Sequence, residues 1–289
     1  MTGNITIDRI TGTIGAVVNG IDLSKPLAAD TVDMLHQAIL DCGVIFFRGQ
    51  AITMEQYWRF MENFGQPHKE ESTGTDEDGP EDVQTGDLVA TRYATAVWHA
   101  DTTSLAMPPI ATALRAVVVP KFGGDTCWAS TAAAWDALDE PMKQMLDGLT
   151  AVHSFQDTID RMGQYAGAFY EGYSSRNAME QVHPVVLTHP ETGRKSLYVS
   201  ECFTTRIVEL DKVASQAVLS YLFQHMARPY FTMRWKWTPN DMCIWDNRTT
   251  QHFAVPDYET SRQMQRIVIK GVKPGEYSEL RPVDKAHAA

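Results

Sequence analysis

Apolar side chains recur at intervals of three and four residues in four stretches of the chain, which is the spacing of one face of a helix. The second stretch carries an aromatic stripe of Tyr57, Phe60 and Phe64. We expect this stripe to pack into the core rather than to bind a cofactor. The pattern predicts amphipathic helices over residues 28–41, 53–64, 131–149 and 213–226.

Short runs of β-branched and aromatic residues lie between these stretches. The densest run, Val44-Ile45-Phe46-Phe47, has no polar position, so we expect a strand that is buried on both faces. Many short strands with a few outer helices predict a mainly β fold, in which helices flank two packed sheets. The predicted strands are two short ones within 5–23, then 43–47, two runs within 111–130, 184–188, 195–199, 231–237, 242–245 and 266–272.

Two stretches show neither the helical nor the strand period. Residues 70–86 are rich in acidic residues, glycine and threonine, and a loop this long inside a compact domain is usually functional or disordered. Because it shortly precedes His99, we predict a mobile lid over 70–97. Residues 156–181 are predicted to form a helical or irregular insertion. The chain has no internal repeat and no linker, so we expect a single domain over 1–289.

The charge balance narrows the possible partners. Of the 289 residues, 36 are Asp or Glu and 25 are Lys or Arg, which gives a formal net charge of −11. Phosphate binding needs clustered Lys and Arg, so we expect neither nucleic acid nor an anionic membrane as partner. A small anionic substrate needs only one or two local arginines and stays compatible with this charge.

The cysteines and the apolar runs bear on the compartment. The four cysteines are widely spaced and beside apolar neighbours, so we expect buried free thiols. No run approaches the roughly 20 apolar residues of a membrane span, and the first residues lack the pattern of a signal peptide. The expected location is therefore the reducing cytoplasm.

The segment Trp98-His99-Ala100-Asp101 carries the candidate chemistry. On an extended strand, side chains at i and i+2 point to the same side, so His99 and Asp101 could face one metal ion. With His252 supplied by a distant segment, the set would be two imidazoles and one carboxylate, the facial set of non-haem Fe(II) oxygenases.

Other interpretations of these residues stay open at this point. Taken singly, a histidine is more often a hydrogen-bonded core residue than a ligand, and zinc hydrolases also use two histidines and a carboxylate. The H-E-x-x-H pattern of many such hydrolases is absent. The alternatives to an oxygenase are a metal-dependent hydrolase and a non-catalytic binding protein of the same fold.

A facial triad leaves three neighbouring positions open on an octahedral Fe(II). An α-keto acid could fill two of them by chelation, and O₂ could take the third. A dicarboxylic keto acid would also need a cation for its far carboxylate. Arg262, ten residues past His252, is a candidate, because guanidinium grips carboxylates in a bidentate manner.

Many ordered segments of this chain match one family. By them the chain resembles the taurine dioxygenase-like branch of the Fe(II)/α-ketoglutarate-dependent dioxygenases, which also contains alkylsulfatase and phenoxyalkanoate dioxygenases. The resemblance covers most of the chain and implies a double-stranded β-helix, the cupin-like jelly roll. The matching segments are 15–16, 20–23, 44–50, 98–101, 123–126, 183–186, 188–190, 203–208, 245–248 and 251–252, with Gly193, Asp257, Tyr258, Arg262 and Arg266.

The resemblance also implies roles for five residues. His99, Asp101 and His252 would bind Fe(II), while Thr126 and Arg262 would hold the distal carboxylate of α-ketoglutarate. With O₂, the implied reaction hydroxylates a substrate C–H bond and releases succinate and CO₂. Since Asp101 keeps its carboxylate, the chloride-binding halogenase variant is not expected. Family members are commonly dimers or tetramers, so a homodimer or homotetramer is expected.

Two residues match the substrate-binding positions of the taurine enzymes. The resemblance implies that Arg266 grips an anionic group and that Phe203 lies against the substrate. The ordinary alternative for Arg266 is an ion pair on a barrel strand. The predicted substrate is a small organic anion: a sulfonate, a sulfate ester or a carboxylate.

Other positions depart from the taurine pattern. After His68, the chain has Glu70 where a substrate-facing histidine is expected. Thr95 replaces an expected asparagine, and Ile159 replaces an aromatic residue. These departures argue against taurine itself, and Glu70 could face an amine.

Overall fold

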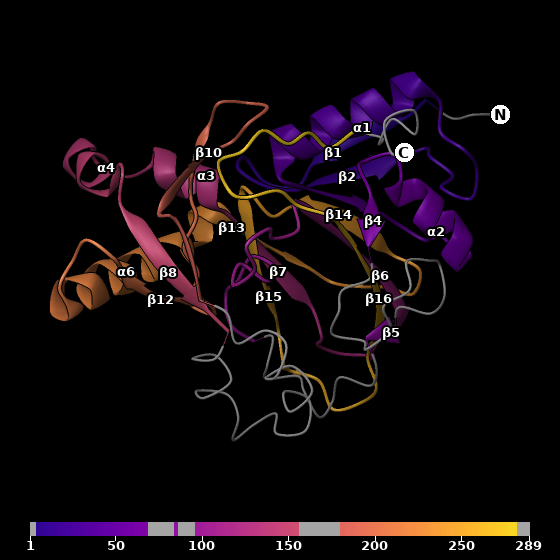
Figure 1. The fold of residues 1–289 in the computed structure, drawn as a ribbon. Helices are drawn as coiled ribbons and strands as arrows, with labels where there is room; N and C mark the ends of the chain where they lie inside the picture. Colours follow the sequence, from indigo (N-terminus) through magenta and orange to yellow (C-terminus); the bar gives the residue numbers. More distant parts are fainter. Residues whose placement is uncertain (1–3, 69–83, 86–95, 156–179, 282–289) are drawn as a thin grey trace.

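The computed structural model describes residues 4–68, 84–85, 96–155 and 180–281 (Figure 1). Most of the predicted lid, 70–97, and of the predicted insertion, 156–181, lies outside these residues. Two residues of the lid region, Gln84 and Thr85, form the short strand β5. The predicted mobility of the lid and the single domain over 1–289 stay predictions.

A large sheet forms one half of the core, in the order β1-β2-β3-β14-β6-β16-β4, with β5 paired to β16. Its described pairs are antiparallel except β2 and β3, which are parallel. A parallel pair needs a long crossover, and the helix between them provides it. The strands are β1 (Thr6–Arg9), β2 (Ala16–Asn19), β3 (Val44–Phe47), β14 (Met242–Asp246), β6 (Ala111–Val118), β16 (Gln263–Ile269), β4 (Pro67–His68) and β5 (Gln84–Thr85).

A smaller sheet, β13-β7-β15, packs against the large one. Phe46 of β3 stacks on Trp235 of β13, with ring centroids 4.0 Å apart, and meets Trp128 of β7 edge-on at 5.2 Å. Burying a side chain of this size stabilises a fold by about 1.5–3 kcal/mol. The predicted mainly β jelly roll is confirmed. The elements here are β13 (Thr232–Trp235), β7 (Thr126–Ser130), β15 (Thr250–Ala254) and the short 3₁₀ helix η2 (Pro229–Phe231).

The helices α1 (Ala29–Cys42) and α2 (Met54–Met61) cover the outer face of the large sheet. Leu35 and Tyr57, on the predicted apolar faces, pack with Ile45 of β3 in one buried cluster. Thr53 begins α2 with a capping box: its side chain accepts a hydrogen bond from the Gln56 backbone N–H, and the Gln56 side chain accepts one from the Thr53 backbone N–H. Both predicted helices are confirmed.

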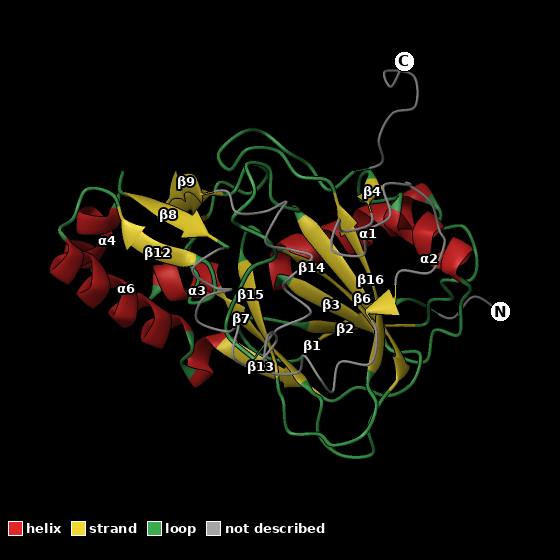
Figure 2. Cartoon of the chain, turned by 60° about the horizontal axis from the view of Figure 1, so that its bottom comes forward, coloured by secondary structure: helices red, strands yellow, loops and turns green. Residues whose placement is uncertain are grey.

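A third layer lies beside the jelly roll (Figure 2). In it, helix α6 packs over the sheet β12-β8-β9, beside the hairpin β10-β11. The elements are α3 (Thr131–Asp136), α4 (Glu140–Leu146), β8 (Thr150–Ser154), β9 (Glu180–Pro184), β10 (Val186–Thr188), β11 (Lys195–Leu197), β12 (Thr204–Ile207) and α6 (Lys212–Met226).

Two of the predicted elements differ from the observed ones for a clear physical reason. The single helix predicted over 131–149 is two helices, because Asp139 caps a new helix and Pro141 in its first turn cannot continue the previous one. The last strand runs over 263–269 rather than 266–272. It ends before Gly271, where a Cβ atom would lie 1.6 Å from the Pro108 carbonyl oxygen.

Two sequence expectations concern the whole chain. The four cysteines are free thiols; Cys127 is half-buried and the other three are buried. Within the described ranges, none of the helices is both long enough and apolar enough to cross a bilayer.

Candidate metal centre

His99, Asp101 and His252 meet at the edge of the small sheet, as predicted. The backbones of His99 and His252 exchange two hydrogen bonds, of 3.1 and 2.8 Å, and the ring centroids lie 4.1 Å apart. Nε2 of His252 is 3.7 Å from Oδ1 of Asp101. One potential ligand atom from each residue lies within 4.8 Å of the others. His99 and Asp101 are buried, and 12% of the His252 side chain is exposed. The set forms a His-Asp-His facial triad.

The predicted reason for this convergence is wrong. His99 makes an isolated bridge, and a turn begins at Asp101, so the two residues do not lie on one extended strand. The turn is tight, since Thr102 has φ of 41° and its carbonyl accepts a hydrogen bond from Leu105 N–H at 2.9 Å. The backbone N–H of Asp101 donates to Oδ1 of Asn247 at 3.3 Å.

Both histidines are held in the form that binds metals. Nδ1 of His99 lies 2.7 Å from the carbonyl oxygen of Val97. Donation to that acceptor fixes the ring and leaves Nε2 for a metal ion. Burial lowers the pKa of His99, and burial together with His99 lowers the pKa of His252 well below its ordinary value. Neutral imidazole is the ligating form.

Asp101 is held as a carboxylate. Its Oδ2 accepts a hydrogen bond from Oγ1 of Thr112 at 2.6 Å, and its Oδ1 accepts one from Arg266 at 2.5 Å. Burial raises the pKa of Asp101, but the positive charge of Arg266 and the hydrogen bond from Thr112 lower it, so the pKa lies below its ordinary range. All three donors therefore suit Fe(II), since two neutral imidazoles and one carboxylate form its facial set.

Arg262 and Thr126, the residues predicted to hold α-ketoglutarate, lie together. Arg262 donates from Nε to the Gly124 carbonyl at 2.9 Å and from Nη2 to Oγ1 of Thr126 at 3.3 Å. Trp237 donates to the same Oγ1 at 3.0 Å. The guanidinium is buried, yet among the described residues no carboxylate lies within 4.0 Å of it. A buried cation of this kind suits the carboxylate of a ligand.

The two residues expected to touch the substrate lie beside the triad. The ring of Phe203 stands edge-on to His99, with centroids 6.4 Å apart, and stacks on Phe155 at 5.9 Å. Arg266 reaches Asp101 from the middle of β16, and 21% of its side chain is exposed. Arg266 thus makes an ion pair with Asp101 and is also partly exposed.

Of the remaining predicted substrate-binding residues, the structure describes only His68. His68 pairs with Val268 across β4 and β16. Paired residues share a face of a sheet, as do residues i and i+2, so His68 lies on the face of Arg266. Three other candidates, Glu70, Thr95 and Ile159, lie outside the described residues.

Two residues next to the triad had no predicted role. Asn247 lies in the matching segment 245–248, which could have pointed to it. Nothing in the sequence around Thr112 marks it, because its contacts with Asp101 and Asn247 join separate parts of the chain.

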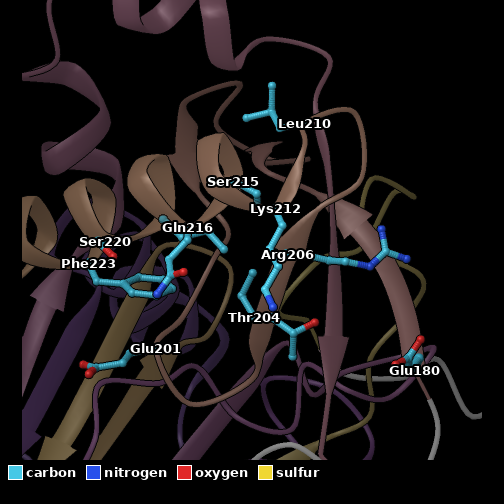
Figure 3. Close-up of a pocket in the computed structure, with 12 residues that line it drawn as sticks. Glu180, Glu201, Thr204, Arg206, Leu210, Lys212, Ser215, Gln216, Ser220 and Phe223 are labelled. Carbon is cyan, nitrogen blue, oxygen red and sulfur yellow. The ribbon is translucent and has the colours of Figure 1, made fainter.

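An open hollow of about 760 Å³ lies away from the triad, between α6 and β12 (Figure 3). Its lining mixes Arg206 and Lys212 with Glu180 and Glu201, and no triad residue is part of it. These mixed charges do not select one class of ligand. The metal centre remains the candidate site.

Comparison with known sequences agrees with this chemistry. Residues 6–268 match the family model described as "Taurine catabolism dioxygenase TauD, TfdA family". The chain is 37% identical over 282 residues to an alkylsulfatase of Acinetobacter baylyi, with 93% of this chain and 86% of the relative covered. It is 35% identical over 281 residues to an alpha-ketoglutarate-dependent sulfate ester dioxygenase of Pseudomonas putida, covering 93% and 91%.

Solved structures share the fold along nearly the whole chain. A taurine dioxygenase from Burkholderia xenovorans superposes with a TM-score of 0.79 at 32% identity, covering 98% of this chain and 97% of that one. AAD-2, solved in complex with Mn(II) and N-oxalylglycine, superposes with a TM-score of 0.78 at 28% identity, covering 94% of this chain and 100% of that one. The chain therefore belongs to the TauD and TfdA family and is an Fe(II)- and α-ketoglutarate-dependent dioxygenase.

Proposed function

We propose that the enzyme hydroxylates the carbon next to the anionic group of a small organic substrate, with alkyl sulfate esters as the leading class. The position of Arg266 carries this proposal. Its guanidinium lies 2.5 Å from Oδ1 of Asp101 and keeps 21% of the side chain exposed. An anionic group bound by Arg266, next to Asp101, would have its neighbouring carbon close to the metal. The alkylsulfatase and sulfate ester dioxygenase among the relatives support the sulfate class.

The triad would hold Fe(II) through the two imidazoles and Asp101. Bound Fe(II) supplies the activation of O₂ and the decarboxylation of α-ketoglutarate to succinate and CO₂. Arg262 and Thr126 would bind the distal carboxylate, because both are buried and their side chains lie within hydrogen-bond distance of each other. The Mn(II) and N-oxalylglycine of the AAD-2 structure support a metal and a small dicarboxylate in a fold of this kind.

Phe203 would form an apolar wall for the substrate chain. Its ring is buried between Phe155 and His99, and apolar walls exclude water from a reacting centre. On a sulfate ester, hydroxylation would replace one hydrogen on the carbon that bears the sulfate. That product then separates into an aldehyde and hydrogen sulfate, which balances the atoms of the step.

The test is succinate release with matched substrates. Alkyl sulfates, alkanesulfonates, carboxylates and uncharged alcohols of equal chain length are supplied with Fe(II), α-ketoglutarate and O₂. We expect alkyl sulfates to give the largest succinate release, with equal amounts of aldehyde and sulfate. Coupling to the uncharged alcohols alone would overturn the role of Arg266.

A pair of variants separates substrate binding from metal binding. Arg266→Gln should raise the KM for the anion by roughly 10- to 100-fold, since a hydrogen bond to a charged group contributes about 1.5–3 kcal/mol. The KM of Arg266→Lys should lie between the KM values of Arg266→Gln and the parent. The visible band that Fe(II) and α-ketoglutarate give without O₂ is the control, because it forms without substrate. A raised KM with an unchanged band supports the proposal, and an unchanged KM contradicts it.

The predicted homodimer or homotetramer and the predicted cytoplasmic location are part of the same proposal. Sedimentation equilibrium of the purified chain would check the first, and cell fractionation the second.

A further inference from the structure

We propose that Thr112 and Asn247 are positioning residues that turn Asp101 so that only its Oδ1 faces the metal. The inference rests on the proposed metal-binding role of the triad. Thr112, Asn247 and Trp245 are buried and form a chain of hydrogen bonds that ends on Oδ2 of Asp101. None of these three residues belongs to the His-Asp-His triad itself.

The direction of the first hydrogen bond follows from chemistry. Asp101 is ionised, so its carboxylate can only accept. The hydroxyl of Thr112, 2.6 Å from Oδ2, must therefore donate its one hydrogen to Asp101. Having no further hydrogen, Oγ1 of Thr112 must accept from its other neighbour, Nδ2 of Asn247, at 2.9 Å.

The orientation of the Asn247 amide is fixed in the same way. Its Oδ1 lies 2.9 Å from Nε1 of Trp245 and 3.3 Å from the backbone N of Asp101. Both neighbours can only donate, so the oxygen must face them and the NH₂ group must face Thr112. The Asn247 amide therefore holds Asp101 at two points. It accepts from the backbone N–H of Asp101, and it donates to the hydroxyl of Thr112, which holds the Asp101 side chain.

The chain leaves one oxygen of Asp101 for the metal. Oδ2 is engaged by Thr112, whereas Oδ1, which also accepts from Arg266, is the oxygen that lies 3.7 Å from Nε2 of His252. The other end of the chain, Trp245, also packs against His252, with ring centroids 4.8 Å apart. Two of the three triad residues are thus oriented through the same buried side chains.

The test uses Co(II) alone, titrated into the metal-free protein and followed by calorimetry and by the visible d–d spectrum. Thr112→Val keeps the shape of the side chain but removes the hydroxyl. We expect it to weaken Co(II) binding by roughly 10- to 100-fold, the range for outer-shell partners of metal ligands, and to alter the spectrum. Thr112→Ser restores the hydroxyl and should restore both readouts.

The matched control is Thr250→Val. It also removes a buried hydroxyl, which donates to the Asp246 carbonyl at 2.7 Å rather than to the triad, and should leave Co(II) affinity unchanged. Thermal unfolding of each metal-free variant reports on folding. If Thr112→Val binds Co(II) as the parent does, or if Thr112→Ser is equally weak, the positioning role is wrong. Failure of the parent itself to bind Co(II) would instead overturn the proposed metal site.

A double variant tests whether the two residues act as one chain. Asn247→Leu alone should also weaken Co(II) binding. Combined with Thr112→Val, it should give a loss smaller than the sum of the two single losses, because the two residues share one hydrogen-bond network and only the contact with the Asp101 backbone N–H is independent of Thr112. Fully additive losses would show that Asn247 acts by a different route and would overturn its part of the proposal.

Discussion

Asp101 and Asp246 are both buried carboxylates beside an arginine, but the protein satisfies them to different extents. Each oxygen of Asp101 accepts one described side-chain hydrogen bond, from Thr112 and Arg266. Asp246 accepts from the backbone N–H, Nε and Nη2 of Arg248, between 2.6 and 3.2 Å, and from His189 at 3.0 Å.

The surroundings of Asp246 form a closed ionic cluster, defined here as Asp246, Arg248, Glu191, His36 and His189. Arg248 donates to Glu191 at 2.8 Å, and Glu191 lies 2.6 Å from His36 of α1. The cluster thus ties the loop between β14 and β15 to α1 and to the turn after β10. The charged groups of this cluster are paired with one another inside the protein.

The contrast shows that burial and charge alone do not mark a functional carboxylate. The pKa of both aspartates lies below the ordinary range: burial raises it, but the adjacent arginine in each case outweighs burial. What distinguishes Asp101 is an oxygen that faces two neutral imidazoles. A carboxylate oxygen that can still accept, and that lies beside two imidazole nitrogens, is the feature that points to a metal site.

The largest expected effect is a loss of stability in the closed cluster. Arg248→Met leaves Asp246 and Glu191 without their shared cation, and removing one partner of a buried ion pair costs about 3–5 kcal/mol. The free energy of unfolding in urea is the measurement. The control is Arg234→Met, because Arg234 is half-exposed between Asp125 and Asp257 and such pairs contribute about 0–1 kcal/mol. Equal losses of unfolding free energy in Arg248→Met and Arg234→Met would show that the buried cluster stabilises the fold no more than an exposed ion pair does.

The next largest effect concerns enzyme activity at the His-Asp-His triad. Asp101→Asn keeps the shape but removes the charge, so we expect succinate formation to fall by at least about 100-fold, the upper end of the range for outer-shell partners. Stability should fall by only about 1–2 kcal/mol, since one hydrogen bond to a charged group is weakened and Arg266 is partly exposed. A stable variant that retains activity would contradict the ligand role of Asp101.

The smallest effect is the acid sensitivity of the closed cluster. Burial raises the pKa of Glu191, but the hydrogen bond with His36 and the charge of Arg248 lower it below the ordinary 4.5. Its stabilising contribution is therefore present above about pH 4.5 and lost as the pH falls through the folded-state value, by at most about 1.4 kcal/mol per pH unit. The stability difference between the parent and Glu191→Gln should shrink from pH 6 to pH 3.5. A difference that does not change with pH would show that Glu191 is not an ionised partner.

Local pattern was enough to predict much of the fold. The apolar run of β3, the capping residue Thr53 of α2 and the apolar face of α6 each act through neighbours in sequence. The helix predicted over 131–149 failed because the apolar spacing continues past the break at Asp139 and Pro141. Periodicity records which side chains are buried and not whether the backbone between them is continuous.

The sequence by itself determined the donor types of the site and the family of the chain. The sequence alone points to His99, Asp101 and His252, with Thr126 and Arg262. Only the tertiary structure decided how Asp101 is presented, because its orientation depends on a turn at Thr102 and on side chains far along the chain. A hydrogen bond between Thr112 and Asn247, 135 residues apart, leaves no periodic trace in the sequence. Such contacts depend on which strands become neighbours in the folded sheet.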